Sequence, residues 1–164
     1  MSFKMIGAAL LMVVAVPAAS QSVDAKKYEV PVYSGQRARP NFAGDGEKYL
    51  RFKTAITNGF RSNPIAMGHY TIITVGCGTS CTFSWVGDVR TGKIITFPLG
   101  GEDYPELQIL TRPNNRLILT LWGSYSGESC TGRLYAFDGD KFVPASAERK
   151  SPNSCSDLIA SKRF

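Results

Sequence analysis

Apolar and polar residues alternate along much of the chain beyond Pro64, with the period of two that is typical of a β-strand. The pattern is clearest at Cys81–Val86, where Phe83 and Trp85 would share one face of the strand. Turn-forming residues separate the alternating segments. We therefore predict a mainly β domain, an antiparallel sandwich or a rolled meander of about seven short strands. The predicted strands are residues 68–76, 81–86, 93–97, 107–111, 117–122, 133–137 and 141–143.

A helical period precedes these strands. Between residues 46 and 58, Tyr49, Phe52 and Ile56 recur at spacings of three and four, which indicates an amphipathic helix. We expect this one N-terminal helix to pack on the sheet. Residues 21–45 are rich in Gln, Ser, Gly, Pro and charged residues, so we expect a loose arm with at most one edge strand.

The first twenty residues have the three parts of a secretory signal. Lys4 supplies the positive charge, Met5–Val16 is an apolar run, and Ala18 and Ser20 are the small residues before a cleavage site. A helix of that run rises only about 18 Å, which is short of the roughly 30 Å hydrocarbon core of a membrane. We expect residues 1–20 to be removed by cleavage after Ser20 or, alternatively, after Ala18.

The signal changes how the composition is interpreted. The formal net charge of +6 includes one lysine of the signal, so the remaining chain carries 18 basic and 13 acidic residues, or +5. We expect a periplasmic or secreted protein with no membrane span, whose residues 46–164 form a single domain. A basic exported domain is expected to meet an envelope protein or a cell-wall polymer, and export disfavours nucleic acid as a partner. No pattern along the chain indicates an oligomeric state.

All four cysteines lie beyond the predicted signal, at Cys77, Cys81, Cys130 and Cys155. An even number of cysteines in an exported chain favours two disulfides, for which three connectivities are available. We favour Cys77–Cys81 and Cys130–Cys155, because Gly78 allows the short first loop to bend tightly. The second bond would close a loop of about 26 residues, worth on the order of 3 kcal/mol, and would attach the C-terminal tail.

The residue pattern predicts neither a metal nor a cofactor. The chain has one histidine, His69, and no Cys-x-x-Cys pair, so a zinc site is disfavoured. The segment Gly87–Lys93 has the glycine and lysine spacing of a phosphate-binding loop. However, Ile94 stands where such a loop needs Ser or Thr, and a strand follows instead of a helix. We interpret this segment as a hairpin turn.

Two sets of residues are candidates for function. The loop from Trp122 to Ser129 combines aromatic residues with Ser and Gly, a composition suited to recognition. Its candidate binding residues are Trp122, Ser124, Tyr125 and Ser126. The alternative is catalytic: His69 is the residue type fit to act as a general base near neutral pH, with the thiol of Cys77 or Cys81 as nucleophile. His69 shares a strand face with Thr71 and Ile73, so we favour a hydrogen-bonded, half-buried structural histidine over a catalytic one.

Two segments resemble a group of small exported bacterial proteins. Met67–Cys81 contains a Gly-His-Tyr strand followed by a Gly-Cys-Gly-x-x-Cys turn, and Val86–Lys93 contains an Asp-x-x-Thr-Gly-Lys hairpin. The resemblance covers about residues 46–143, and it implies export and a β fold but no activity. In architecture alone, the chain also resembles periplasmic lysozyme inhibitors, which insert a loop into their target. Gly123–Gly127 would play that part, although the basic charge of the chain opposes binding to a basic lysozyme.

Two hypotheses follow. The first is a non-enzymatic envelope module of binding or inhibitor type, which recognises a protein or a cell-wall polymer. The second is a small periplasmic enzyme that uses His69 with a cysteine thiol.

Overall fold

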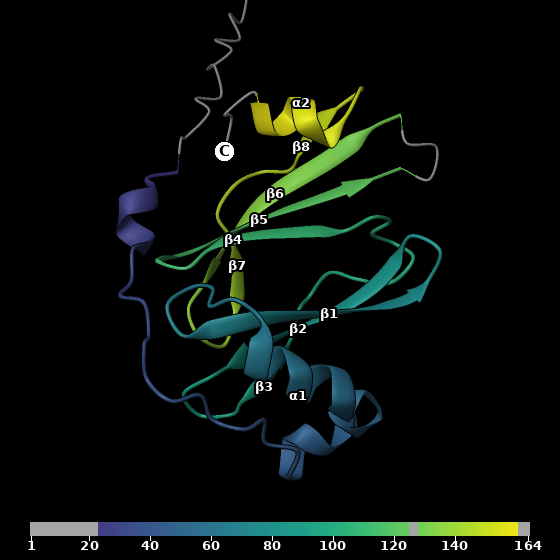
Figure 1. Ribbon diagram of the computed structural model, residues 1–164. Coiled ribbons are helices and arrows are strands. Elements are labelled where there is room, and N and C mark those ends of the chain that lie inside the picture. Colours follow the sequence, from purple (N-terminus) through teal and green to yellow (C-terminus); the bar gives the residue numbers. More distant parts are fainter. Residues whose placement is uncertain (1–22, 125–127, 161–164) are drawn as a thin grey trace, which may run out of the picture.

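Eight strands form two antiparallel sheets in the computed structural model, which describes residues 23–124 and 128–160 (Figure 1). The fold is therefore mainly β, as predicted. The smaller sheet has the order β1-β2-β3, and the larger has the order β4-β5-β6-β7, with β8 also paired to β6. The strands of the smaller sheet are β1 (Tyr70–Gly78), β2 (Cys81–Asp88) and β3 (Ile94–Thr96). Those of the larger are β4 (Gln108–Arg112), β5 (Asn115–Gly123), β6 (Cys130–Phe137), β7 (Phe142–Pro144) and β8 (Arg149–Ser151).

The alternation of side chains along the strands places apolar groups in three layers. Ile73 pairs with Trp85 across β1 and β2, and both side chains face the helical side of the smaller sheet. The neighbouring Val86 faces the other way, into the core between the sheets, where Ile118 of β5 is also fully buried. On the outer face of the larger sheet, Leu121 packs with the C-terminal helix. Figure 1 shows the same order of layers, from α1 through both sheets to α2.

The single amphipathic helix predicted over residues 46–58 is not present in that form. Residues Gly44–Phe52 form a 3₁₀ helix, η2, and the α-helix α1 spans Lys53–Ser62. Tyr49 and Ile56 are buried against the smaller sheet, so the apolar period reflects real packing. The pitch changes between them because a 3₁₀ turn has three residues where an α-turn has 3.6.

Residues 23–45, the described part of the arm that was expected to be loose, are attached to the domain. A short 3₁₀ helix, η1 (Ala25–Tyr28), begins this part, and Glu29 forms an isolated bridge with Asn115 in place of the predicted edge strand. The Arg37 guanidinium donates to the backbone oxygens of Phe60 and Asn63, at 3.0 and 2.8 Å. These carbonyls lie at the end of α1, where helix carbonyls lack partners within the helix.

The C-terminal segment contains two elements that the sequence pattern did not predict. The strand β8 is short and polar, and the helix α2 spans Cys155–Ala160. The Cys130–Cys155 disulfide joins β6 to α2, and the Cys77–Cys81 disulfide closes the β1–β2 turn. The favoured pairing is thus confirmed. None of the helices within residues 23–124 and 128–160 is long and apolar enough to cross a membrane.

Candidate functional site

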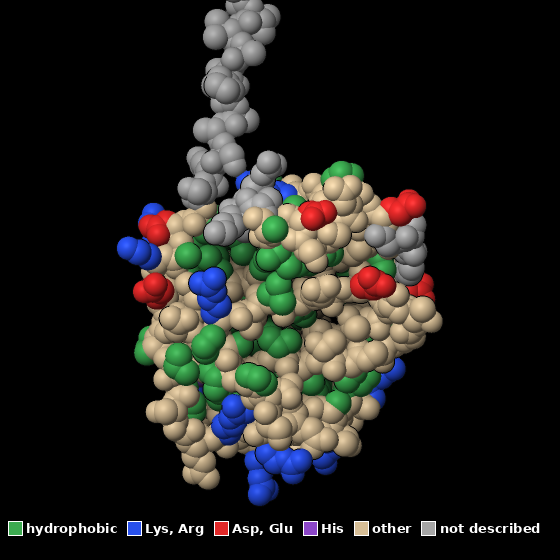
Figure 2. Space-filling view, turned by 45° about the horizontal axis from the view of Figure 1, so that its top comes forward, with side chains coloured by type: hydrophobic (Ala, Val, Ile, Leu, Met, Phe, Trp, Pro, Cys, Tyr) green, Lys and Arg blue, Asp and Glu red, His purple; other side chains and the backbone are tan. Residues whose placement is uncertain are grey.

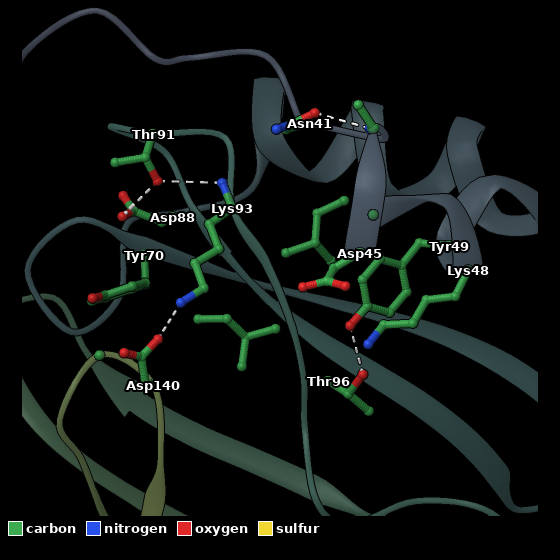
Figure 3. A pocket seen from close by; sticks show the side chains of 15 residues that line it. Asn41, Asp45, Lys48, Tyr49, Tyr70, Asp88, Thr91, Lys93, Thr96 and Asp140 are labelled. Carbon is green, nitrogen blue, oxygen red and sulfur yellow. Dashed lines mark hydrogen bonds and ion pairs between the residues drawn. The ribbon is translucent and has the colours of Figure 1, made fainter.

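A cleft with a volume of about 900 Å³ opens where η2, the β2–β3 turn and the β6–β7 turn meet (Figure 3). Asp45 and Lys48 reach it from η2, and both are exposed. Lys93 enters from the β2–β3 turn and Asp140 from the β6–β7 turn. Segments that are far apart in the sequence therefore supply charged groups to one hollow.

An ion pair between Lys93 and Asp140 spans one side of the cleft (Figure 3). The hydrogen bond to Asp140 raises the pKa of the Lys93 ammonium group, so this group stays charged at neutral pH. Both side chains are more than half exposed, at 55% and 67%. Such a pair contributes little to stability, but it connects the smaller sheet to a turn of the larger one.

Asp88 is held in place by the turn that follows it. Its Oδ1 accepts a hydrogen bond from the Arg90 backbone N–H at 2.9 Å, and its Oδ2 accepts one from the Thr91 hydroxyl at 2.9 Å. Gly92 adopts a φ of 84°, which a side chain would disfavour, and its N–H donates to the Asp88 backbone oxygen at 2.8 Å. The Gly87–Lys93 segment is thus a hairpin turn that presents a fixed carboxylate to the cleft.

Tyr70 forms part of the cleft wall beside Asp88 (Figure 3). Tyr70 is 5% exposed, and its ring packs edge-on against Phe137, with 4.9 Å between ring centroids. Burial raises the pKa of the Tyr70 hydroxyl above its usual value, and Asp88 adds to this effect. The hydroxyl therefore remains protonated and is able to donate or accept a hydrogen bond.

A second, more apolar cavity of about 450 Å³ continues from the first. The two cavities share Lys48, Tyr49 and Thr96 in their walls. The hydroxyls of Tyr49 and Thr96 are 2.8 Å apart and hydrogen-bonded between the cavities. Together the cavities form a groove along β3 that is charged at one end and aromatic at the other. The aromatic end is lined by Phe52, Phe83, Trp85 and Phe97.

His69 lies behind this site, next to Asp88. Its Nε2 is 3.9 Å from Oδ1 of Asp88, which is too long for a hydrogen bond, and its side chain is 12% exposed. Burial lowers the pKa of the imidazole, and the charge of Asp88 opposes this effect in part. His69 is therefore mainly neutral at pH 7, and it is not among the residues that line the cleft.

The structure does not bring His69 to either candidate thiol. His69 directly precedes β1, whereas Cys77 lies near the far end of the same strand. Eight residues of strand separate two positions by roughly 25 Å. Cys81 lies at that far end as well, bonded to Cys77. The three residues of the catalytic alternative are thus split between the two ends of one hairpin.

The candidate loop residues are only partly described. Trp122 is half-buried and packs edge-to-face against Tyr104, with 5.3 Å between ring centroids. The Ser124 backbone N–H donates to the Ser129 oxygen at 3.1 Å, which closes the base of the loop. Tyr125 and Ser126 lie outside the described residues. Part of the Trp122 ring is therefore buried in packing and is not available for binding.

A third hollow lies on the outer face of the larger sheet and has a volume of about 360 Å³. Leu110 and Ile159 line it and are 41% and 44% exposed. Figure 2 brings the α2 end forward and shows apolar side chains gathered on this side, with Lys and Arg side chains below them. Both η1 and α2 border the hollow, η1 through Ala25 and α2 through Ile159.

The cleft was not predicted from the sequence, although one motif in its wall was recognised. The Asp-x-x-Thr-Gly-Lys hairpin supplies Asp88, Thr91 and Lys93 to the wall. Asp140 lies in a predicted hairpin turn, but no pattern along the chain places it in one cleft with Asp45, because the packing of separate elements brings them together. Within residues 23–124 and 128–160, no three His, Cys, Asp or Glu side chains converge in a way that would hold a metal ion.

Comparisons with family models, with curated proteins and with solved structures found no match to this chain.

Proposed function

We propose that this protein is a non-enzymatic binding module of the bacterial envelope, and that the groove along β3 is its binding site. The observation that carries the proposal is the pair of joined cavities, one with charged groups and one with aromatic walls. Concave sites of several hundred Å³ with a few fixed polar groups are the usual form of a ligand site. The signal over residues 1–20 would direct the chain to the periplasm or the exterior, where disulfides persist.

Binding at the groove has more support than either a thiol enzyme or binding at the loop after Trp122. A thiol enzyme would need a free sulfur at Cys77 or Cys81, and both sulfurs are in one disulfide. The loop after Trp122 offers a ring that is already packed on Tyr104. By contrast, Asp45 and Lys48 are exposed at the groove.

The test uses the secreted form of the protein, immobilised, with an envelope extract and with purified cell-wall polymer. The groove variant is Asp45→Ala/Lys48→Ala, and its matched control is Glu47→Ala, an exposed residue of η2 that does not line the groove. A third variant, Trp122→Ala, tests the loop. Captured proteins are identified by mass spectrometry, and polymer binding is measured by co-sedimentation.

The proposal predicts that a partner or polymer is retained by the wild type and by Glu47→Ala and is lost by the groove variant. Loss with Trp122→Ala alone would move the binding site to the loop and overturn the assignment of the groove. Absence of any retained partner or polymer would overturn the binding function itself.

A further inference from the structure

The edge strand of the smaller sheet runs along the groove. Among the described residues 23–124 and 128–160, β3 pairs with β2 on one side and with no strand on the other. The Phe97 N–H donates to the Ser84 oxygen at 3.0 Å, and the Asp88 N–H donates to the Lys93 oxygen at 2.9 Å. Lys93 and Phe97 flank β3, so their two bonds to β2 determine which backbone groups of β3 point toward β2.

The backbone of Ile94 and Thr96 points the other way. In an antiparallel strand, successive residues turn their N–H and C=O groups to opposite sides. Lys93, Ile95 and Phe97 therefore turn these groups toward β2, and Ile94 and Thr96 turn theirs away from it. In the part of the chain that the structure describes, neither residue has a backbone hydrogen-bond partner on the outer side. An edge of this kind is a template for another strand.

Pockets for side chains lie on this free edge. Both cavities include Thr96, and the larger also includes Ile94 and Ile95. The Ile94 side chain packs on the η2 side of the sheet, whereas Ile95 packs toward the core between the sheets. A strand added here would therefore send alternate side chains to either side of β3, as in other peptide sites built on a sheet edge.

The two cavities differ in what they would accept. The larger has three carboxylates, at Asp45, Asp88 and Asp140, against the two ammonium groups of Lys48 and Lys93, which favours a positive side chain. The smaller cavity has aromatic and apolar walls and is of a size to hold a large apolar side chain.

We propose that β3 binds an extended peptide segment of a partner protein as an added strand. The segment places a basic side chain in the charged cavity and a large apolar side chain in the aromatic cavity. Its backbone bonds to the outer N–H and C=O groups of Ile94 and Thr96. This inference rests on the proposed function, because it assigns a class of ligand to the same groove.

The test begins with selection of peptides from a random displayed library on the secreted protein. Selected sequences are synthesised and then N-methylated at one residue at a time, so that single backbone donors are removed without any change to the protein. Affinity is measured by calorimetry. Amide hydrogen exchange of Ile94 and Thr96 is compared with and without peptide, and the Asp45→Ala/Lys48→Ala variant tests side-chain selection.

Strand addition predicts enrichment of a basic and a large apolar residue among the selected peptides. N-methylation should weaken binding at least about tenfold at alternate residues and by less than about twofold at the residues between them. The Ile94 and Thr96 amides should gain protection. Uniform effects of N-methylation, or protection elsewhere, would overturn the inference. Retention of cell-wall polymer by the groove without any peptide binding would overturn it too, and would leave the proposed function standing.

Discussion

The hydroxyl groups of Tyr49 and Thr96 are 2.8 Å apart and form a hydrogen bond between η2 and β3. The bond ties the helical wall of the groove to the edge strand at the point that both cavities share. Tyr49 is 6% exposed, and its ring packs edge-on against Trp85, so the phenol is fixed by packing as well as by this bond.

Removal of this bond tests its part in stability. Tyr49→Phe keeps the ring and leaves Thr96 without its partner, so we expect the free energy of unfolding to fall by about 1 kcal/mol. The control is Tyr33→Phe, which removes a local and exposed bond from the Tyr33 hydroxyl to the Gln36 oxygen. Urea unfolding should show a change below about 0.5 kcal/mol for this control. Equal decreases in the free energy of unfolding in both variants would mean that the Tyr49–Thr96 bond stabilises the fold no more than the exposed Tyr33 bond does.

His69 should make stability depend on pH. Its pKa in the folded protein is lower than the usual 6.5, mainly because of burial. Between the folded and unfolded pKa values the unfolded chain binds more protons, so the free energy of unfolding falls as pH drops below about 6.5. Urea unfolding between pH 5.5 and 7.5 should show this slope in the wild type and a weaker one in His69→Gln. The chain has one histidine, so its imidazole signal can be followed directly by NMR. A folded-state midpoint at or above 6.5 would contradict the account.

The helical layer packs so closely on β2 that one methyl group would disturb it. A Cβ atom added at Gly87 would clash with the ring of Phe60, which is 1% exposed. We expect Gly87→Ala to lower the free energy of unfolding by about 1–3 kcal/mol. Gly76→Ala is the matched control in the same hairpin, because nothing lies within 4 Å of its added Cβ. Thermal unfolding of the two variants should differ clearly, and similar melting temperatures would argue against this packing.

Seven of the eight strands, β1 to β7, were predictable because each has its own local pattern. Trp85 and Ile73 lie on the buried helical face that their alternation indicates. β8 was missed because its three residues, Arg-Lys-Ser, have no apolar alternation and form a strand only by pairing with β6. The groove could not be predicted for a similar reason. Asp45 and Asp140 meet through the packing of separate layers, and no spacing along the chain records that packing.

The two disulfides should differ in their response to reductant. Cys77 is exposed at the tip of the β1–β2 hairpin, whereas Cys130 is 1% exposed beneath α2. A low concentration of dithiothreitol should therefore reduce Cys77–Cys81 first, as measured by alkylation and peptide mass spectrometry. Earlier reduction of Cys130–Cys155 would contradict the burial described here.

The Cys130–Cys155 bond closes the longer loop, so its replacement by two serines should lower the free energy of unfolding by about 3 kcal/mol.

The free edge of β3 is the feature on which the inferred strand addition depends, and amide hydrogen exchange of the unliganded protein measures whether that edge is free. The N–H groups of Ile95 and Phe97 bond to β2, and those of Ile94 and Thr96 face the groove. We expect the Ile95 and Phe97 amides to exchange on the order of 100-fold more slowly than those of Ile94 and Thr96, after correction for intrinsic rates. Equal protection at all four positions would show that the edge is already covered, and would contradict the inferred addition of a strand to β3.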